Sequence, residues 1–316
     1  MRDKHAKTGR THLGRPVRIG SLAGAQEGSH VPVLSRFLGG GDASIKRAKR
    51  PQELRAKWTR STKEGLDWLR RPPSARAPWL YRALLALGGF VLYRVCAIKV
   101  EIEGRENLPD GGGFILAAAL HRGWIDPLIP LNALPIEPRI WFLGSAPTAF
   151  DKPWKERLLR KTGGILPVWR GGAVDVHVRA AKGVMKENAV LCLFIEGAII
   201  GPPDRVWPGV RGGSGLLALR TGAPIVPFVL AGTDELYRGK RIAAKVLPPV
   251  SVPDLLGADW PGQPPAQDTR AELALAKLIA RRIADRIDAE LPPMLARVTD
   301  PPEKPRRWKG LTRLMR

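Results

Sequence analysis

From residue 99 onward, the sequence alternates short apolar runs of β-forming character with segments of helical character. Seven runs are predicted as strands: 99–104, 113–120, 139–144, 164–169, 189–197, 224–232 and 243–250. Helices are predicted at 127–134, 151–162, 174–187, 212–221 and 269–291. Because strands that alternate with helices usually pair in parallel, this order predicts an α/β fold with a mostly parallel sheet flanked by helices.

The chain divides into four predicted parts. Residues 1–75 are rich in Gly, Ser, Lys and Arg without a regular apolar period, which predicts a basic flexible extension. Residues 76–98 form an apolar helix, 99–292 the main α/β domain, and 293–316 a basic tail with interleaved apolar residues. No apolar run follows the first basic residues, so we expect no secretory signal, while an organellar transit peptide stays open.

The apolar segment 76–98 has three possible positions. Its uncharged run, residues 83–93, lies between Arg82 and Arg94 and is shorter than the ~20 residues that a spanning helix needs. We expect a helix that lies in a membrane interface, with a helix of a soluble core or a spanning helix as the alternatives.

The composition limits the possible partners. Lys and Arg number 52 against 29 Asp and Glu, a net charge of +23, so the surface attracts polyanions such as anionic lipid or nucleic acid. No helix-turn-helix, zinc-finger or RNA-binding signature is present, so we expect no specific nucleic-acid partner, although a basic nucleic-acid-binding protein remains a rival hypothesis. Cys96 and Cys192 stand alone in apolar runs, which predicts neither a disulfide nor a metal site and favours a reducing compartment.

One histidine follows the predicted strand 113–120. In an open α/β sheet, side chains just beyond the carboxyl ends of strands meet in the crevice where ligands bind, and His121 falls there. Asp126 precedes Pro127, so it is a candidate N-cap of the next helix. Alternatively its carboxylate accepts a hydrogen bond from one imidazole nitrogen and leaves the other as a general base.

Three other segments end near the same edge. Arg170 closes the strand at 164–169, where a guanidinium can hold a phosphate, although a plain surface arginine is the alternative. Glu196 and Gly197 close the strand at 189–197, and Arg211 begins the helix at 212–221. We expect these four residues to bind substrate in a shared crevice. Glu196 could instead organise the site, or be a buried structural carboxylate at the end of the strand. His177 lies in a helical run, where we expect it to be exposed.

Four blocks of the sequence resemble the 1-acylglycerol-3-phosphate acyltransferase family of lysophospholipid acyltransferases: "HRGWIDP", "GGILPVWR", "FIEG" and "GAPIVPF". In that family the histidine of the first block is the general base and the aspartate orients it, which implies these roles for His121 and Asp126. The arginine that ends the second block is associated with the acceptor's phosphate, which implies that role for Arg170. The resemblance covers roughly residues 79–230, about half of the chain.

The resemblance implies that an acyl chain passes from acyl-CoA or acyl carrier protein to the hydroxyl of a lysophosphatidate-like glycerolipid, without a cofactor. It also implies a peripheral enzyme on the cytoplasmic face of an anionic membrane. Leu120 replaces the asparagine common in the family, and Ile195, Ala198 and Ile199 replace the usual proline, threonine and arginine of the third block. These departures leave a different acceptor, or a non-catalytic lipid-binding relative, as alternatives.

Overall fold

The computed structural model describes residues 74–298, except 124, 151, 169–173, 198, 200–203, 207 and 235. Nearly all of the predicted basic extension (1–75) lies outside the described residues. So do Arg170 and residues 299–316 of the predicted tail.

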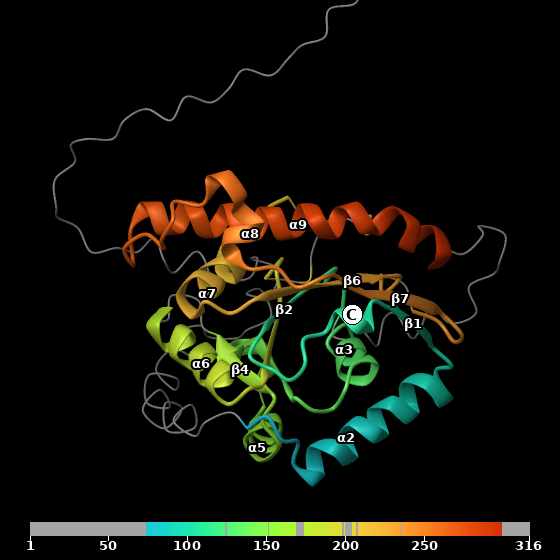
Figure 1. Ribbon diagram of the computed structural model, residues 1–316. Coiled ribbons are helices and arrows are strands. Elements are labelled where there is room, and N and C mark those ends of the chain that lie inside the picture. Colours follow the sequence, from blue (N-terminus) through green and yellow to red (C-terminus); the bar gives the residue numbers. More distant parts are fainter. Residues whose placement is uncertain are drawn as a thin grey trace, which may run out of the picture. The chain divides into compact units, whose positions relative to one another are not determined.

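Seven strands form one sheet in the order β1-β7-β6-β2-β5-β3-β4. Each corresponds to one of the seven predicted runs: β1 (Lys99–Glu103), β2 (Ile115–Ala119), β3 (Ile140–Ser145), β4 (Ile165–Val168), β5 (Val190–Phe194), β6 (Ile225–Ala231) and β7 (Arg241–Val246). Helices flank the sheet on both faces (Figure 1), so the predicted α/β class is confirmed.

Five neighbouring strands, from β6 to β4, run parallel to one another. Strand β7 pairs with β6 antiparallel, and β1 pairs with β7 in parallel, so these two strands run opposite to the other five. A parallel crossover needs a connection of about a dozen residues or more, usually with a helix, whereas residues 232–240 alone connect β6 to β7. The short connection therefore accounts for the change of direction.

Eight α-helices are described: α2 (Trp79–Phe90), α3 (Leu128–Ala133), α4 (Ala146–Ala149), α5 (Pro153–Thr162), α6 (Val174–Lys186), α7 (Gly213–Thr221), α8 (Val252–Leu256) and α9 (Arg270–Val298). A π-helical turn, Val91–Val95, continues α2, and 3-10 turns lie at Arg105–Asn107 and Gly257–Asp259. The five helices predicted from residue 127 onward correspond to α3, α5, α6, α7 and α9, and the apolar helix predicted at 76–98 corresponds to α2 and the π-helical turn.

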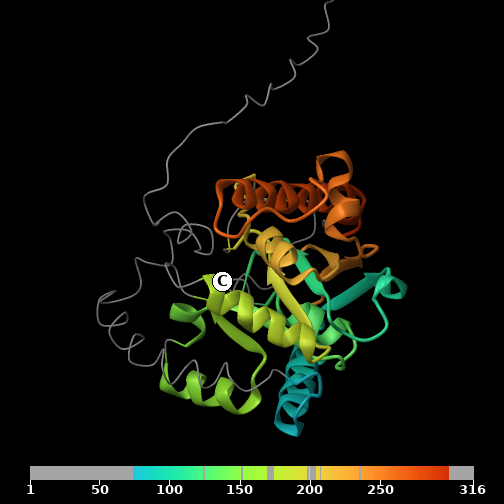
Figure 2. The ribbon, with the colours of Figure 1, turned by 60° about the vertical axis from the view of Figure 1, so that its left-hand side comes forward.

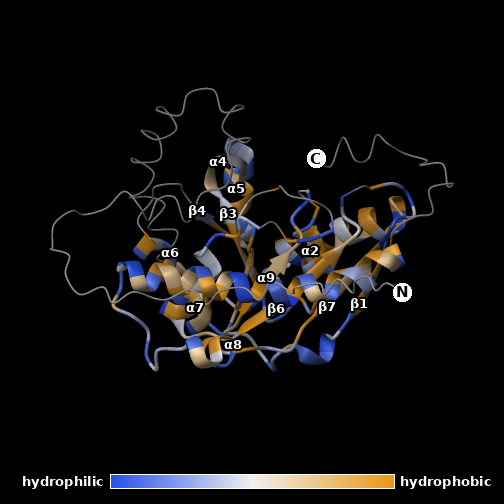
Figure 3. Ribbon diagram, turned by 90° about the horizontal axis from the view of Figure 1, so that it is seen from above, coloured by the Kyte–Doolittle hydropathy of each residue, from blue (hydrophilic) through white to orange (hydrophobic). Residues whose placement is uncertain are grey.

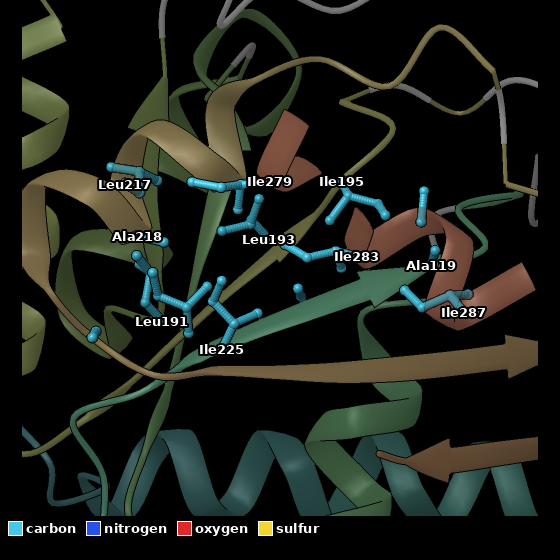
Figure 4. Packing of buried hydrophobic residues seen from close by; sticks show 14 of the residues in the cluster. Ala119, Leu191, Leu193, Ile195, Leu217, Ala218, Ile225, Ile279, Ile283 and Ile287 are labelled. Carbon is cyan, nitrogen blue, oxygen red and sulfur yellow. The ribbon is translucent and has the colours of Figure 1, made fainter. Parts of the chain in front are cut away.

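The two faces of the sheet have separate apolar cores. Helices α6, α7 and α9 cover one face, and α9 lies along it on the side away from α2 (Figures 1 and 2). In Figure 4, Ile279, Ile283 and Ile287 of α9 lie over side chains of the central strands, among them Leu193 and Ile225. Helix α3 and the π-helical turn pack on the opposite face. The central strand β2 is fully buried between these layers.

Helix α9 is longer than expected, because it continues through Pro292 and Pro293 to Val298. A proline inside a helix removes a hydrogen bond and normally ends or kinks it. Here Met294 and Val298 are buried, and the Lys240 amine donates to the Val298 carbonyl at 3.2 Å. Packing and this terminal contact outweigh the local preference, so part of the predicted tail is helical.

Helix α2 lies on the surface of the described part and buries only one side. Tyr81 and Leu85 pack inward, whereas Trp79, Leu87 and Phe90 are 78%, 59% and 58% exposed.

In the hydropathy colouring of Figure 3, strands β6 and β7 are mainly hydrophobic, while α9 in front of them also carries hydrophilic residues. Among residues 74–298, none of the described helices has the length and apolar character needed to cross a membrane.

The prediction for His177 was wrong, because its side chain is buried on α6. Val174, Val178 and Ala181 are also buried, and His177 stands three residues after Val174. Residues at spacings of three, four and seven share one face of a helix, so this periodicity already placed the imidazole on the core side. Burial lowers the pKa of His177 to about 4.

Close packing of α7 against α9 gives a first prediction. A Cβ atom on Gly215 would stand 2.1 Å from the Ala276 carbonyl oxygen, so Gly215→Ala is expected to reduce the free energy of unfolding by about 1–3 kcal/mol. Gly88, inside α2, has no atom within 4 Å of such a Cβ, and Gly88→Ala should stabilise the protein by about 0.5–1 kcal/mol. Urea unfolding of both variants checks this difference in sign.

Buried His177 gives a second prediction. Its folded-state pKa of about 4 lies below the ordinary 6.5, so the unfolded chain binds more protons between these values. Stability is therefore lost as the pH falls through this window, by about 2 kcal/mol between pH 7 and pH 5. Urea titrations at both pH values should show this loss in the wild type and not in His177→Leu. An equal pH dependence in the two proteins would contradict it.

Candidate active site

The carboxyl ends of β2 and β5 bring the candidate site together. These strands pair in parallel with Ala118 opposite Phe194, and the Ile195 N–H donates to the Ala118 carbonyl at 3.0 Å. His121 follows β2 and Glu196 follows β5 at the same edge of the sheet. The connection after β2 leads to β3 on one side, whereas that after β5 leads to β6 on the other. A crevice at such a reversal is where open α/β sheets bind ligands.

The ring of His121 contacts the carboxylate of Asp126. The distance from His121 Nδ1 to Asp126 Oδ2 is 2.9 Å, and the aspartate side chain is fully buried. The same oxygen accepts the backbone N–H groups of Arg122 at 2.5 Å and Gly123 at 2.7 Å. A carboxylate at Nδ1 fixes the proton there and leaves Nε2 with its lone pair. The ring has the orientation that a general base needs.

Asp126 does not cap the helix that follows it. Helix α3 begins at Leu128 after Pro127, and no side chain caps its N-terminus. The first N–H groups, of Leu128 and Ile129, donate to the carbonyls of Ile125 and Asp126. The carboxylate of Asp126 instead turns back toward the preceding residues, so the N-cap alternative for this side chain is wrong.

Phe194 supports the imidazole from the neighbouring strand. The two rings are stacked, with centroids 4.2 Å apart and an interplanar angle of 16°. The side chain of His121 remains 16% exposed. The ring is thus held on one face and one edge, and part of the side chain is exposed.

Glu196 lies at the expected edge of the sheet, next to His121. Its side chain is fully buried, and Oε2 accepts the His121 N–H at 2.5 Å while Oε1 accepts from Arg122 Nη1 at 2.8 Å. Burial raises the pKa of the Glu196 carboxyl, and the Arg122 guanidinium opposes this shift. Both oxygens contact protein donors, so in this structure Glu196 organises the turn at His121.

Arg122 is a residue that the sequence analysis missed. Its side chain is only 7% exposed. Besides Glu196, the guanidinium donates to the carbonyls of His121 at 3.1 Å and Arg205 at 3.0 Å. The sequence did contain one signal. Arg122 is a charged residue between two apolar segments, and the carboxylate of Glu196 was predicted at the same edge of the sheet.

The remaining predicted residues have separate outcomes. Gly197 has a φ of +66°, which a residue with a Cβ adopts only with strain, and Arg211 Cδ lies 3.9 Å from the place where that Cβ would stand. Arg211 therefore lies beside the turn that carries Glu196. Ile199, at the position of the family's arginine, is 46% exposed. Arg170 lies outside the described residues, so its predicted place at the site is untested.

The described residues offer no metal cluster and no reactive thiol. Among them, no group of three or more His, Cys, Asp or Glu side chains is placed to hold a metal ion. Cys96 and Cys192 are both buried as free thiols, and burial raises the pKa of Cys192, which disfavours the nucleophilic thiolate.

Comparisons with known proteins find similarity to acyltransferases. The family model described as "Acyltransferase" matches residues 99–231. Among solved structures, the chain is similar to the 1-acyl-sn-glycerophosphate acyltransferase PlsC from Thermotoga maritima, with 19% identity and a TM-score of 0.43 over 66% of this chain and 79% of that one. A search of curated proteins returned no match. The residues that match this acyltransferase model carry His121, Asp126 and Glu196.

Proposed function

We propose that this protein transfers an acyl chain from a thioester, acyl-CoA or acyl carrier protein, to the hydroxyl of a lysophosphatidate-like glycerolipid. The observation that carries the proposal is the contact of His121 Nδ1 with buried Asp126 Oδ2 at the carboxyl end of β2. It stands inside the residues that match the acyltransferase family. Of the two alternatives, a non-catalytic relative does not account for an accessible imidazole oriented by a buried carboxylate.

His121 acts as the general base in the proposed reaction. Nε2 removes the proton from the acceptor hydroxyl while its oxygen attacks the thioester carbonyl, forming the new C–O bond. The tetrahedral intermediate then expels the thiolate, which takes the proton from the imidazolium as the C–S bond breaks. Asp126 stabilises the imidazolium and keeps the ring oriented. No covalent enzyme intermediate is required, which agrees with the buried state of Cys192.

The proposed enzyme works at the cytoplasmic face of a membrane as a peripheral protein. Helix α2 and the π-helical turn that continues it expose Trp79, Leu87, Phe90 and Val95, which are 78%, 59%, 58% and 55% exposed. Contiguous exposed apolar side chains on an amphipathic helix are typical of contact with a lipid interface. The predicted basic segments 1–75 and 293–316 would add attraction to anionic lipid, about 1 kcal/mol for each Lys or Arg near the surface.

The catalytic pair gives a prediction for activity. His121→Ala should lower kcat by about 10²- to 10⁴-fold, because it removes the general base. Asp126→Asn should have a loss of similar order, since an amide favours the wrong imidazole tautomer. Release of thiol from acyl-CoA, with lysophosphatidate and with monoacylglycerol as acceptors, measures both variants and the need for a phosphate.

Asp285→Asn is the matched control, because Asp285 is an exposed residue of α9 that pairs with Arg281 and lies outside the site. Its rate should equal that of the wild type. Equal background rates in the wild type and His121→Ala would leave only a non-catalytic lipid-binding role. A higher rate with monoacylglycerol than with lysophosphatidate would contradict a phosphate-bearing acceptor.

Helix α2 gives a prediction for membrane binding. Leu87→Glu should weaken partitioning onto vesicles with anionic lipid by about tenfold or more, because a buried leucine contributes about 1.5–3 kcal/mol. Ala274→Glu adds the same charge on the exposed side of α9 and should have little effect. Vesicle flotation measures both. Unchanged flotation of Leu87→Glu, or tighter salt-dependent retention on DNA than on vesicles, would contradict a lipid surface as partner.

A further inference from the structure

The backbone N–H and carbonyl groups of His121 both form hydrogen bonds with one buried ion pair, Glu196–Arg122. The His121 N–H donates to Glu196 Oε2 at 2.5 Å, and the His121 carbonyl accepts from Arg122 Nη1 at 3.1 Å. The same Nη1 donates to Glu196 Oε1 at 2.8 Å, which closes the arrangement. Asp126 and Phe194 fix the ring of His121, but this ion pair fixes its backbone.

Arg122 also connects the turn to a distant part of the chain. Its Nη2 donates to the Arg205 carbonyl at 3.0 Å, and the next N–H, of Val206, donates to Asp288 Oδ1 at 2.6 Å. The Val206 side chain is buried in the core under α9. The peptide between Arg205 and Val206 is therefore held from one side by the histidine turn and from the other by α9.

We infer that Arg122 is a positioning residue, which holds His121 through Glu196 and braces the catalytic turn against α9 through the Arg205–Val206 peptide. The inference rests on the proposed function for its effect on the rate. Arg122 acts through other residues, because its guanidinium is almost fully buried and contacts protein acceptors.

The geometry requires an arginine at this position. A guanidinium is planar and presents its donors in a fixed fork, so it can serve Glu196 and the Arg205 carbonyl in two directions at once. A lysine amine can pair with the Glu196 carboxylate but does not span both acceptors. Arg122→Lys should therefore keep the ion pair and lose the brace to α9, which separates the two parts of the role.

The test compares kcat, KM and thermal unfolding of Arg122→Gln, Arg122→Lys and Asp288→Ala in the full chain. Loss of positioning should lower kcat by about 10- to 100-fold in Arg122→Gln with little change in KM, and by less in Arg122→Lys. Asp288→Ala removes the acceptor of the Val206 N–H, on the other side of the Arg205–Val206 peptide. When it is combined with Arg122→Lys, kcat should fall little further than in Arg122→Lys alone, because the brace is already lost. Asp288→Asn keeps an acceptor oxygen and should retain more activity than Asp288→Ala.

Arg282→Gln is the matched control. Arg282 lies on α9, away from the site, and forms an exposed ion pair with Asp259. Its replacement should leave the kinetics of the wild type unchanged. If Arg122→Gln does not fold because Glu196 remains as an unpaired buried charge, Arg122→Gln combined with Glu196→Gln replaces it. That pair has no net charge to bury and should fold with kcat still lowered, because the His121 and Arg205 carbonyls have lost their donor.

Nitrogen-15 NMR of the His121 ring, assigned with His121→Asn, supplies a readout that does not depend on turnover. Arg122→Gln, or its double variant, should show a changed tautomer balance at His121 relative to the wild type. Unchanged ring signals, or a kcat per folded molecule equal to that of the wild type, would overturn the positioning role. A wild type without thioester turnover would instead overturn the proposed function, and the ring signals would still decide the role of Arg122.

Discussion

Strands β2 and β5 pair in parallel with Ala118 opposite Phe194, and the chain leaves both strands at the same edge. This register places the imidazole of His121 on the ring of Phe194 and the His121 N–H on Glu196. A register shift of one residue would turn every side chain of β5 to the other face of the sheet. Both faces are buried here, so packing on two sides fixes the register and, with it, the geometry of the site.

The site buries two carboxylates within a few residues of each other, and each is compensated differently. Glu196 is paired with the charge of Arg122, while Asp126 accepts two backbone N–H groups and the ring of His121. Burying a carboxylate is costly unless donors surround it. The compensated pair Glu196–Arg122 holds the backbone, which leaves the charge of Asp126 to act on the imidazole. Glu196 thus fixes the backbone at His121, and Asp126 orients the imidazole that we propose as the base.

Local patterns were sufficient for the strands and most helices, because short apolar runs report on the nearest residues. The His121–Asp126 contact was one of two alternatives for a pair five positions apart, and the proline after Asp126 favoured the other one, the N-cap. The direction of β7 depended on the length of one connection, and the extent of α9 depended on packing around Pro292. Arg122 was missed because its partner Glu196 lies 74 positions away in the sequence. His177 was missed although the period of α6 placed it inward. A single sequence does not show which charged residues, far apart in the chain, contact each other in the fold.

The helix proposed to contact lipid and the turn that carries His121 share one support. Helix α2 packs against α3, the helix that begins directly after Asp126 and Pro127. At its N-terminal end, α2 is held by Arg139, whose guanidinium lies 4.2 Å from the ring of Tyr81. A lysolipid acceptor has its acyl chain in the membrane and its hydroxyl at the surface. An apolar helix fixed to α3 would therefore set the height of His121 above the lipid, so that the same packing that stabilises the fold would align the base with its substrate.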